Sequence, residues 1–309
     1  MEEIYEFNRL LVALDLSEHD ESLIAYVSKM SKLSAVDTIY FVHVVSSLKL
    51  PDNIKKKYPD LIAPVDEGIR KSIEYTIEAF GSLDDSINIE IIIREGDPIK
   101  EILNTIREKS IDLTVLGRKS NQKANLRIIK KIVRVAPCSV SIIPEYLPEL
   151  LHKILVPVDF SENALMSLRR ATFFSQKFSN LEILTLHCYE VPQGYSKIGK
   201  TFDEFSQIMM ENAKSEMDHF LAEHKLEIKN HKPHYTRCKA RHLPSALYQF
   251  AIANNVNAIV IGSRGRDSIS NFLLGSVTEG LIEHDQYMPL IIVKSKTDHM
   301  GVLEAIQAL

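Results

Sequence analysis

Short apolar runs rich in β-branched residues alternate with longer amphipathic segments along the whole chain. This alternation is typical of parallel sheets with crossover helices. The predicted strands of the first half are Arg9 to Leu14, Thr38 to Val45, Ile87 to Arg94, Leu113 to Leu116 and Ser139 to Ile143. Those of the second half are Lys153 to Val158, Leu181 to His187, Lys229 to Tyr235, Ala258 to Ile261 and Leu290 to Val293. The pattern therefore predicts an α/β fold with two tandem, open, parallel five-stranded sheets flanked by helices.

Helices are predicted between these strands. One covers Glu18 to Leu33 after Ser17, and another covers Glu162 to Phe178 after Ser161, with each serine placed as an N-cap. A third covers Phe202 to His224 and carries apolar residues at helical spacing, which favours core or interdomain packing. These residues are Phe205, Ile208, Met209, Ala213, Met217 and Phe220.

The sequence repeats itself at a nearly constant interval. The segment RLLVALDLSEHDESLIAYVSKMSKL returns as HKILVPVDFSENALMSLRRATFFSQKF, which pairs Asp15 with Asp159 at an offset of 144. Further along, Gly117 pairs with Gly262 at an offset of 145. An offset that persists over such a distance indicates a duplicated domain.

The repeat divides the chain into two domains and a tail. A length of 309 residues exceeds the usual size of one hydrophobic core. We predict domains at residues 1–146 and 151–296, joined by the short linker Pro144 to Leu151, and a tail helix at residues 297–309. Because the linker is short, the halves are expected to dock as a pseudo-two-fold pair, with homodimer assembly left open.

Composition and charge narrow the class of protein. The chain is 45% hydrophobic and 25% charged, as in average soluble proteins, and its formal net charge of -4 gives no global reason to expect nucleic acid or a membrane as a partner. The polar start lacks the features of a signal peptide. Cys138, Cys188 and Cys238 are odd in number and far apart, which fits neither disulfides nor a metal knuckle. These features predict a cytoplasmic protein.

A glycine-rich segment follows the fourth strand of the second half. The sequence IVIGSRGRDSISNFLLGSVTEGLI places Gly262, Gly265, Gly275 and Ser276 in the pattern G-x2-G-x9-G-S. Glycines permit left-handed turns and close approach of backbone amides to an anion, for which we expect Gly262 and Gly265 to be used. Gly275 and Ser276 are expected to open the last helix, whose N-terminus attracts phosphate.

This spacing, together with Asp159 in VPVDFS, resembles the ATP-binding members of the universal stress protein family. The resemblance implies a Rossmann-like, adenine-nucleotide α-hydrolase-like fold that binds ATP, with Mg²⁺ brought by the nucleotide. It also implies that Asp159 contacts the adenine or ribose and that the backbone near Cys188 meets the base. The predicted binding residues are Pro157, Val158, Asp159, Cys188, Gly262, Ser263, Arg264, Gly265, Arg266, Gly275, Ser276 and Val277.

Other interpretations of this segment stay open. Gly262 can simply end a strand, Gly275 can simply allow close helix packing, and Arg264 and Arg266 either contact phosphates or are solvated. No catalytic residue is assigned, because the chain contains neither a Walker lysine nor a nucleophile elbow. An ATP-binding regulatory module is therefore favoured over a slow ATPase or nucleotidyl transferase and over a nucleotide-free scaffold.

The first half departs from the glycine pattern. Ser120 stands where the second glycine belongs, and the closing Gly-Ser pair is missing, so this half is expected to bind ATP poorly despite Asp15. The same segment is basic, which favours a solvated helix face over an anion contact. Its cations are Arg118, Lys119, Lys123, Arg127, Lys130, Lys131 and Arg134.

The histidines do not predict a metal site. His231 and His234 lie three apart in a predicted strand, so their side chains point to opposite faces. His43 and His187 recur at the offset of 144 at strand ends, and we predict packed, hydrogen-bonded histidines there.

Overall fold

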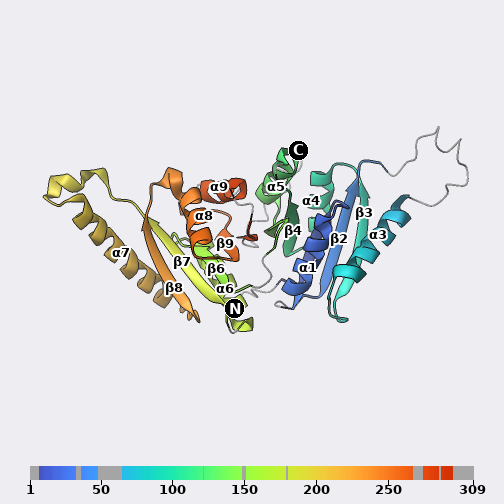
Figure 1. Cartoon of the computed structure of the whole chain (residues 1–309), viewed down its shortest axis with the longest axis horizontal. Coiled ribbons are helices and arrows are strands. Elements are labelled where there is room, and N and C mark those ends of the chain that lie inside the picture. The colour runs from blue at the N-terminus through green and yellow to red at the C-terminus, as the bar shows by residue number, and fades with distance from the viewer. Residues whose placement is uncertain are drawn as a thin grey trace, which may run out of the picture. The chain divides into compact units, whose positions relative to one another are not determined.

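The computed structural model describes two compact units of the chain (Figure 1). The residues described are 7–32, 36–47, 65–120, 122–147, 151–178, 180–266, 274–284 and 287–294. The predicted tail helix and the middle of the predicted linker lie outside them.

The first unit alternates strands and helices. Its strands are β1 (Arg9–Leu14), β2 (Thr38–Val45), β3 (Asn88–Glu95), β4 (Leu113–Arg118) and β5 (Ser139–Pro144). Its helices are α1 (His19–Ser31), α3 (Val65–Phe80), α4 (Pro98–Glu108) and α5 (Lys123–Val135). Helix α1 packs on α3 and α4 packs on α5.

The second unit repeats this order. Its strands are β6 (Lys153–Pro157), β7 (Glu182–Tyr189), β8 (His231–Arg237), β9 (Ala258–Gly262) and β10 (Leu290–Val293). Its helices are α6 (Glu162–Lys177), η1 (Gln193–Ile198), α7 (Phe202–Glu223), η2 (Ala240–His242), α8 (Leu243–Ala253) and α9 (Ser276–His284).

Both units have the same strand order and register. The first runs β3-β2-β1-β4-β5 and the second β8-β7-β6-β9-β10, with parallel pairing throughout each described ladder. Arg9 faces Thr38 and Lys153 faces Glu182, so the repeat offset of 144 is kept in the ladder itself. The predicted α/β class is confirmed. In each unit the strand order reverses beside the first strand, where open parallel sheets form a crevice at their carboxyl ends.

Burial differs between the inner strands of each unit and one of its outer strands. The central strands β4 and β9 are buried almost throughout, whereas the outer strands β3 and β8 are partly exposed. Buried side chains on both faces explain why the central strands are continuous apolar runs. No helix of the described residues is both long and apolar enough to cross a bilayer.

Two expectations about the helices need correction. Ser161 caps α6 as predicted, accepting a bond from Ala164 N, but Ser17 does not cap α1, whose N-cap residue is Glu18 without a side-chain bond. Along α7 only Ala213, Met217 and Phe220 are buried. In the N-terminal part of the predicted apolar stripe Ile208 is exposed and Phe205 and Met209 are half-buried, so the stripe is fully buried only toward the C-terminal end of the helix.

Candidate functional site

The carboxylate of Asp159 organises the crevice of the second unit. The strand-to-helix turn is tight, with Phe160 at φ 61°. Asp159 Oδ1 accepts bonds from the amide and hydroxyl of Ser161, at 3.1 and 2.6 Å. Asp159 Oδ2 accepts a bond of 2.9 Å from the backbone amide of Arg266, in the loop after β9. An anionic oxygen therefore already lies against an amide of the predicted phosphate loop.

The glycines of this loop are needed for close packing. A Cβ on Gly265 would lie 2.7 Å from Asp159 Oδ2, and one on Gly262 would lie 2.5 Å from Asn163 Cβ. The prediction of left-handed turns at Gly262 and Gly265 is wrong, since in the described residues only Gly96 and Gly199 have positive φ among glycines. What glycine provides here is room for Asp159 and for the first turn of α6.

The two ends of the loop meet in a narrow neck. Gly275 N donates to Ser263 O at 2.9 Å, and a Cβ on Gly275 would lie 3.3 Å from Arg264 Cα. Ser276 then begins α9, followed by Val277. The neck therefore brings the loop against the helix N-terminus, whose amides and dipole favour an anion. Residues 267–273, between the two ends, lie outside the described residues.

One hydrogen bond fixes the last helix in both units. Thr278 Oγ1 donates to Gly262 O at 2.8 Å in the second unit. Asn125 Nδ2 donates to Gly117 O at 3.0 Å in the first. Thr278 and Asn125 are each the third residue of their helix. The two loops thus begin and end at equivalent points.

Between those points the loops differ in length. Thirteen residues, 263–275, separate the strand-end glycine from the helix in the second unit, against five, 118–122, in the first. The first unit thus lacks eight residues of loop as well as the glycines. Sequence comparison identified the missing glycines, and the structure adds the missing length.

The remaining predicted residues lie on the neighbouring strands. Pro157 ends β6, and buried Val158 accepts a 2.8 Å bond from His187 Nδ1. His43 makes the corresponding bond of 2.9 Å to Leu14 O, so the prediction of packed, hydrogen-bonded histidines is confirmed. Cys188 lies near the end of β7. Burial and the nearby Cys238 raise the pKa of the Cys188 thiol to about 12, so it stays protonated at neutral pH.

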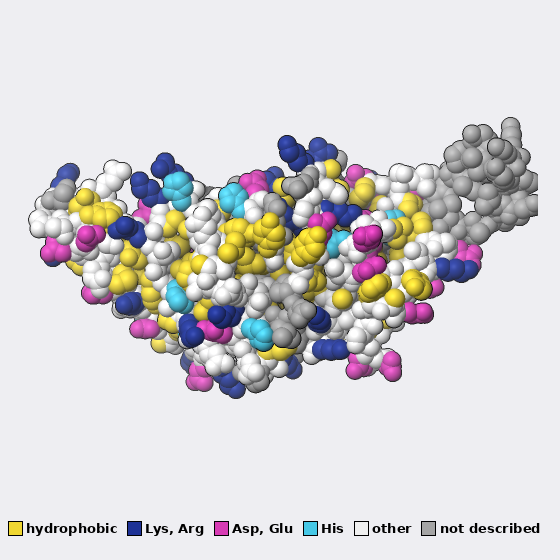
Figure 2. Space-filling model, viewed as in Figure 1, with side chains coloured by type: hydrophobic (Ala, Val, Ile, Leu, Met, Phe, Trp, Pro, Cys, Tyr) yellow, Lys and Arg dark blue, Asp and Glu magenta, His cyan; other side chains and the backbone are white. Residues whose placement is uncertain are grey.

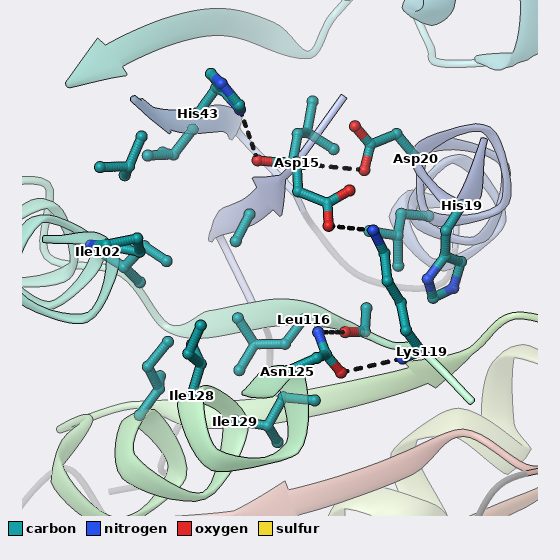
Figure 3. Close-up of a pocket in the computed structure, with 18 residues that line it drawn as sticks. Asp15, His19, Asp20, His43, Ile102, Leu116, Lys119, Asn125, Ile128 and Ile129 are labelled. Carbon is teal, nitrogen blue, oxygen red and sulfur yellow. Dashed lines mark hydrogen bonds and ion pairs between the residues drawn. The ribbon is translucent and has the colours of Figure 1, made fainter. Parts of the chain in front are cut away.

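In the first unit a lysine crosses the crevice. Lys119 Nζ forms an ion pair with Asp15, and the backbone amide of Lys119 donates to Asn125 Oδ1 at 3.0 Å. Figure 3 shows Lys119 reaching from the end of β4 to the carboxylate at the end of β1. Burial acts to raise the pKa of Asp15, but bonds from Lys119 and Ser17 and the charge of Lys119 outweigh it and lower the pKa. The carboxylate that matches Asp159 is therefore ionised and engaged.

Asp20 makes additional hydrogen bonds to the strand-to-helix turn of the first unit. Its carboxylate accepts bonds from Leu16 N at 2.7 Å and Asp15 N at 3.3 Å. Leu16 has φ 61°, as Phe160 has in the second unit. Burial raises the pKa of Asp20 to about 6 despite these bonds. The position equivalent to Asp20 in the second half is Ala164.

The basic segment of the first unit is only partly a solvated face. Exposed cations on α5 include Lys123, Arg127 and Lys131. Arg118, however, is buried in β4, and the Lys119 side chain is only 16% exposed. For these two the prediction of a solvated face is wrong. On the face drawn in Figure 2, Lys and Arg side chains are interspersed with Asp and Glu.

Sequence reasoning missed several residues that shape the two crevices. Asn163 packs on Gly262, Thr278 bonds to it, and Lys119 and Asp20 fill the turn of the first unit. Asp20 had a detectable signal, an acid in the first turn of a helix. The other three depend on contacts across strands. The described residues contain no group of three or more His, Cys, Asp or Glu side chains that could hold a metal ion.

Comparison with known proteins identifies the repeated unit. The model of the universal stress protein family matches residues 6–144 and again residues 151–294. The chain belongs to the universal stress protein family. Its two matches coincide with the two compact units, so it is a tandem member.

Relatives of this universal stress protein span one or both halves. Universal stress protein MJ0577 of Methanocaldococcus jannaschii is 27% identical over 169 residues, which cover 48% of this chain and 97% of the relative. A universal stress protein from Archaeoglobus fulgidus matches with a TM-score of 0.59 at 20% identity, over 94% of this chain and 97% of its own. A functionally unknown protein from Pseudomonas aeruginosa matches with a TM-score of 0.60 at 14% identity, over 99% of both chains. These solved structures support the fold of the whole tandem chain.

Proposed function

We propose that this universal stress protein is an ATP-binding regulatory module whose second half holds the nucleotide. The observation that carries the proposal is the bond from Arg266 N to the carboxylate of Asp159. It supports an oxyanion site because a loop amide already binds an anionic oxygen beside the N-terminus of α9. The loop of thirteen residues and the neck at Gly275 supply the length and shape to extend this contact to phosphates.

The nucleotide is proposed to use the twelve predicted residues from Pro157 to Val277. Asp159 and the backbone near Cys188 would meet the ribose and adenine, while the loop amides and Ser276 would meet the phosphates. Mg²⁺ is proposed to arrive with the nucleotide. Arg264 and Arg266 flank Gly265 and are proposed to contribute charge-assisted contacts to phosphate oxygens.

The proposed setting is the reducing cytoplasm, where the partner is an adenine nucleotide. Cys138, Cys188 and Cys238 are all free thiols, as expected for a protein kept in a reducing compartment. Nucleotide occupancy of the second half is proposed to act as the regulatory signal, with no catalytic residue assigned.

The test is the nucleotide content of the purified full chain. Acid extraction followed by chromatography should release ATP or ADP at about one per chain. Two nucleotides per chain would contradict the assignment to the second half alone. If no nucleotide is bound after incubation with ATP and Mg²⁺, the alternative of a nucleotide-free scaffold would replace the proposal. Phosphate release should be slow, and rapid release would identify an enzyme instead.

A further inference from the structure

The outer strand of the first sheet has an open edge. In the described part of the chain β3 pairs with β2 and with no other strand, and it lies at the outside of the sheet (Figure 1). Asn88 N donates to Asp37 O and Gly96 N donates to Val45 O, so the even-numbered residues of β3 face β2. Successive residues of a strand direct their backbone groups to opposite sides. The odd-numbered residues therefore direct theirs outward, and these are Ile89, Ile91, Ile93 and Glu95.

Most backbone groups on this edge lack a partner. Among the described residues, the amides of Ile89, Ile91 and Ile93 have no hydrogen-bond partner. The carbonyl of Ile91 accepts a bond of 3.0 Å from Nη1 of Arg70 on α3. Arg70 is exposed, so another donor can replace it. A long strand edge with unpaired amides favours the addition of a further strand.

The second half has a proline on the equivalent edge. The ladders pair Ile91 with Phe41 and Pro233 with Thr185. Phe41 and Thr185 differ by the repeat offset of 144, so Pro233 is the counterpart of Ile91. Proline has no N–H, and on an outer strand it prevents the addition of another strand. The first half keeps isoleucine at this position, and with it the outward amide.

The sequence of β3 is complementary to itself when two copies run antiparallel. Opposite residues of an antiparallel pair must both face the partner strand or both face away from it, so a two-fold axis has to pass through a residue. An axis at Ile92 places Glu90 opposite Arg94 of the second copy, and Ile91 opposite Ile93. An axis at Ile91 would place Glu90 against Ile92, and an axis at Ile93 would place Arg94 against Ile92. The charges therefore select the register centred on Ile92.

The charges beside this register alternate in sign. Within one chain, Glu90 pairs with Lys109 at 2.6 Å and Arg94 pairs with Glu108. These four side chains are 30 to 52% exposed, so each pair alone stabilises the chain little. A carboxylate or a guanidinium can also bond to a second partner. Across the axis the order becomes Lys109, Glu90, Arg94, Glu108, and Glu95, the remaining charged residue of β3, faces Ile89.

We propose that two copies of this chain associate through β3, with the strands antiparallel and centred on Ile92. The amide of Ile93 in each copy replaces Arg70 as the donor to Ile91 O in the other. The association also covers Ile89, whose side chain is 41% exposed. The inference uses only residues of the first half, so it is independent of nucleotide binding by the second.

The first test is sedimentation equilibrium of the full chain over a range of protein concentrations. The unaltered chain should form a dimer as its concentration rises. Ile91→Pro gives the first half the proline of the second and should weaken dimerisation at least about tenfold, because it removes an outward amide from each strand. A chain that stays monomeric, or a dimer of unchanged affinity in a folded Ile91→Pro variant, would overturn the proposal.

A charge exchange tests the same interface without proline and replaces the first variant if that variant fails to fold. Arg94→Glu and Glu90→Arg each place like charges opposite each other and should each weaken dimerisation at least about tenfold. The double variant Glu90→Arg/Arg94→Glu restores opposite charges and should recover the dimer. Arg127→Glu makes the same change of charge on exposed α5 and should have no effect. Failure of the double variant to recover the dimer would contradict the register.

A cross-link tests the register directly. Opposite residues that face away from the partner strand have Cβ atoms about 4.5 to 5.5 Å apart, so Ile92→Cys should form a disulfide across the axis. Oxidised glutathione takes up the two thiol hydrogens and becomes two reduced molecules. Ile91→Cys lies opposite Ile93 and should not cross-link with its own copy. A non-reducing gel shows the result, and a linked Ile91→Cys dimer would contradict the axis at Ile92. Nucleotide content should be the same in all these variants as in the unaltered chain.

Discussion

The two halves differ most in the loop between the fourth strand and the last helix, although the strand and the helix on either side of that loop correspond. In each, a strand-end glycine leads into a loop that returns to a helix held by the same hydrogen bond. In the second half that loop is long, and its amide at Arg266 faces the carboxylate of Asp159. In the first half the loop is short, and Lys119 satisfies the matching carboxylate. The comparison teaches that two copies of one crevice can differ in loop length and in the partner of the first-strand carboxylate while the strand order stays the same.

The largest expected effect is a loss of ATP affinity caused by a substitution in the second half, where the two ends of the long loop meet. Gly275→Val should weaken ATP binding about a thousandfold, or about 4 kcal/mol, because the added side chain meets Arg264 Cα at 3.3 Å and Ser263 O at 3.4 Å. Displacing the neck removes two or more amide contacts to phosphate, each worth about 1.5 to 3 kcal/mol. Equilibrium dialysis with labelled ATP measures the loss.

The matched control for this variant is Gly194→Val. Gly194 is in the same half, and a Cβ there has no atom within 4 Å, so ATP affinity should be unchanged. Retained affinity in Gly275→Val would place the phosphates elsewhere.

The next effect is a pH dependence of folding stability that arises from Asp20 in the first half. Because the pKa of Asp20 is raised to about 6 in the folded state, from an ordinary value of 3.8, the folded chain holds this proton more tightly than the unfolded chain. The protonated side chain therefore stabilises the folded chain by about 3 kcal/mol well below pH 4, and this stabilisation is lost as the pH rises through about 6.

The variant Asp20→Asn should remove this pH dependence. Urea unfolding at a series of pH values gives the difference in free energy between the variant and the unaltered chain, which cancels the other titrating groups. That difference should change by roughly 2 to 3 kcal/mol between pH 4 and pH 7. A constant difference would show that Asp20 titrates normally. Ala164→Ser, at the equivalent position of the second half, should give a difference that does not vary with pH.

The smallest effect compares the paired carboxylates directly. Asp159→Asn should weaken ATP binding about thirtyfold, because a contact to a charged group contributes about 2 kcal/mol. Asp15→Asn should leave ATP binding unchanged, since Asp15 is engaged by Lys119. Titration calorimetry on both variants measures this. Equal losses would mean that the first half also binds ATP and would contradict the assignment to the second half alone.

Much of the frame could be predicted from the sequence. The offset of 144 between Asp15 and Asp159 reappears as the register of the strand ladders. This could be predicted because apolar periodicity and an internal repeat can both be read directly from the sequence. The glycine positions were also visible, and the solved relatives agree with the predicted fold.

The role of individual residues could not be predicted as well. Lys119 follows an arginine in a basic segment and resembles a solvated residue, but its partner Asp15 is more than a hundred positions away. Gly265 was expected to provide a left-handed turn, whereas its missing side chain makes room for Asp159 Oδ2. Both depend on contacts between strands, which a single sequence does not encode locally.

The shared hydrogen bond from the third helical residue to the strand-end glycine has a wider consequence. Asn125 and Thr278 make equivalent hydrogen bonds at the ends of two loops of very different length. We therefore expect the residues between these two points to be exchangeable as one unit. Such an exchange should alter the length and charge of the loop without changing the register of any strand.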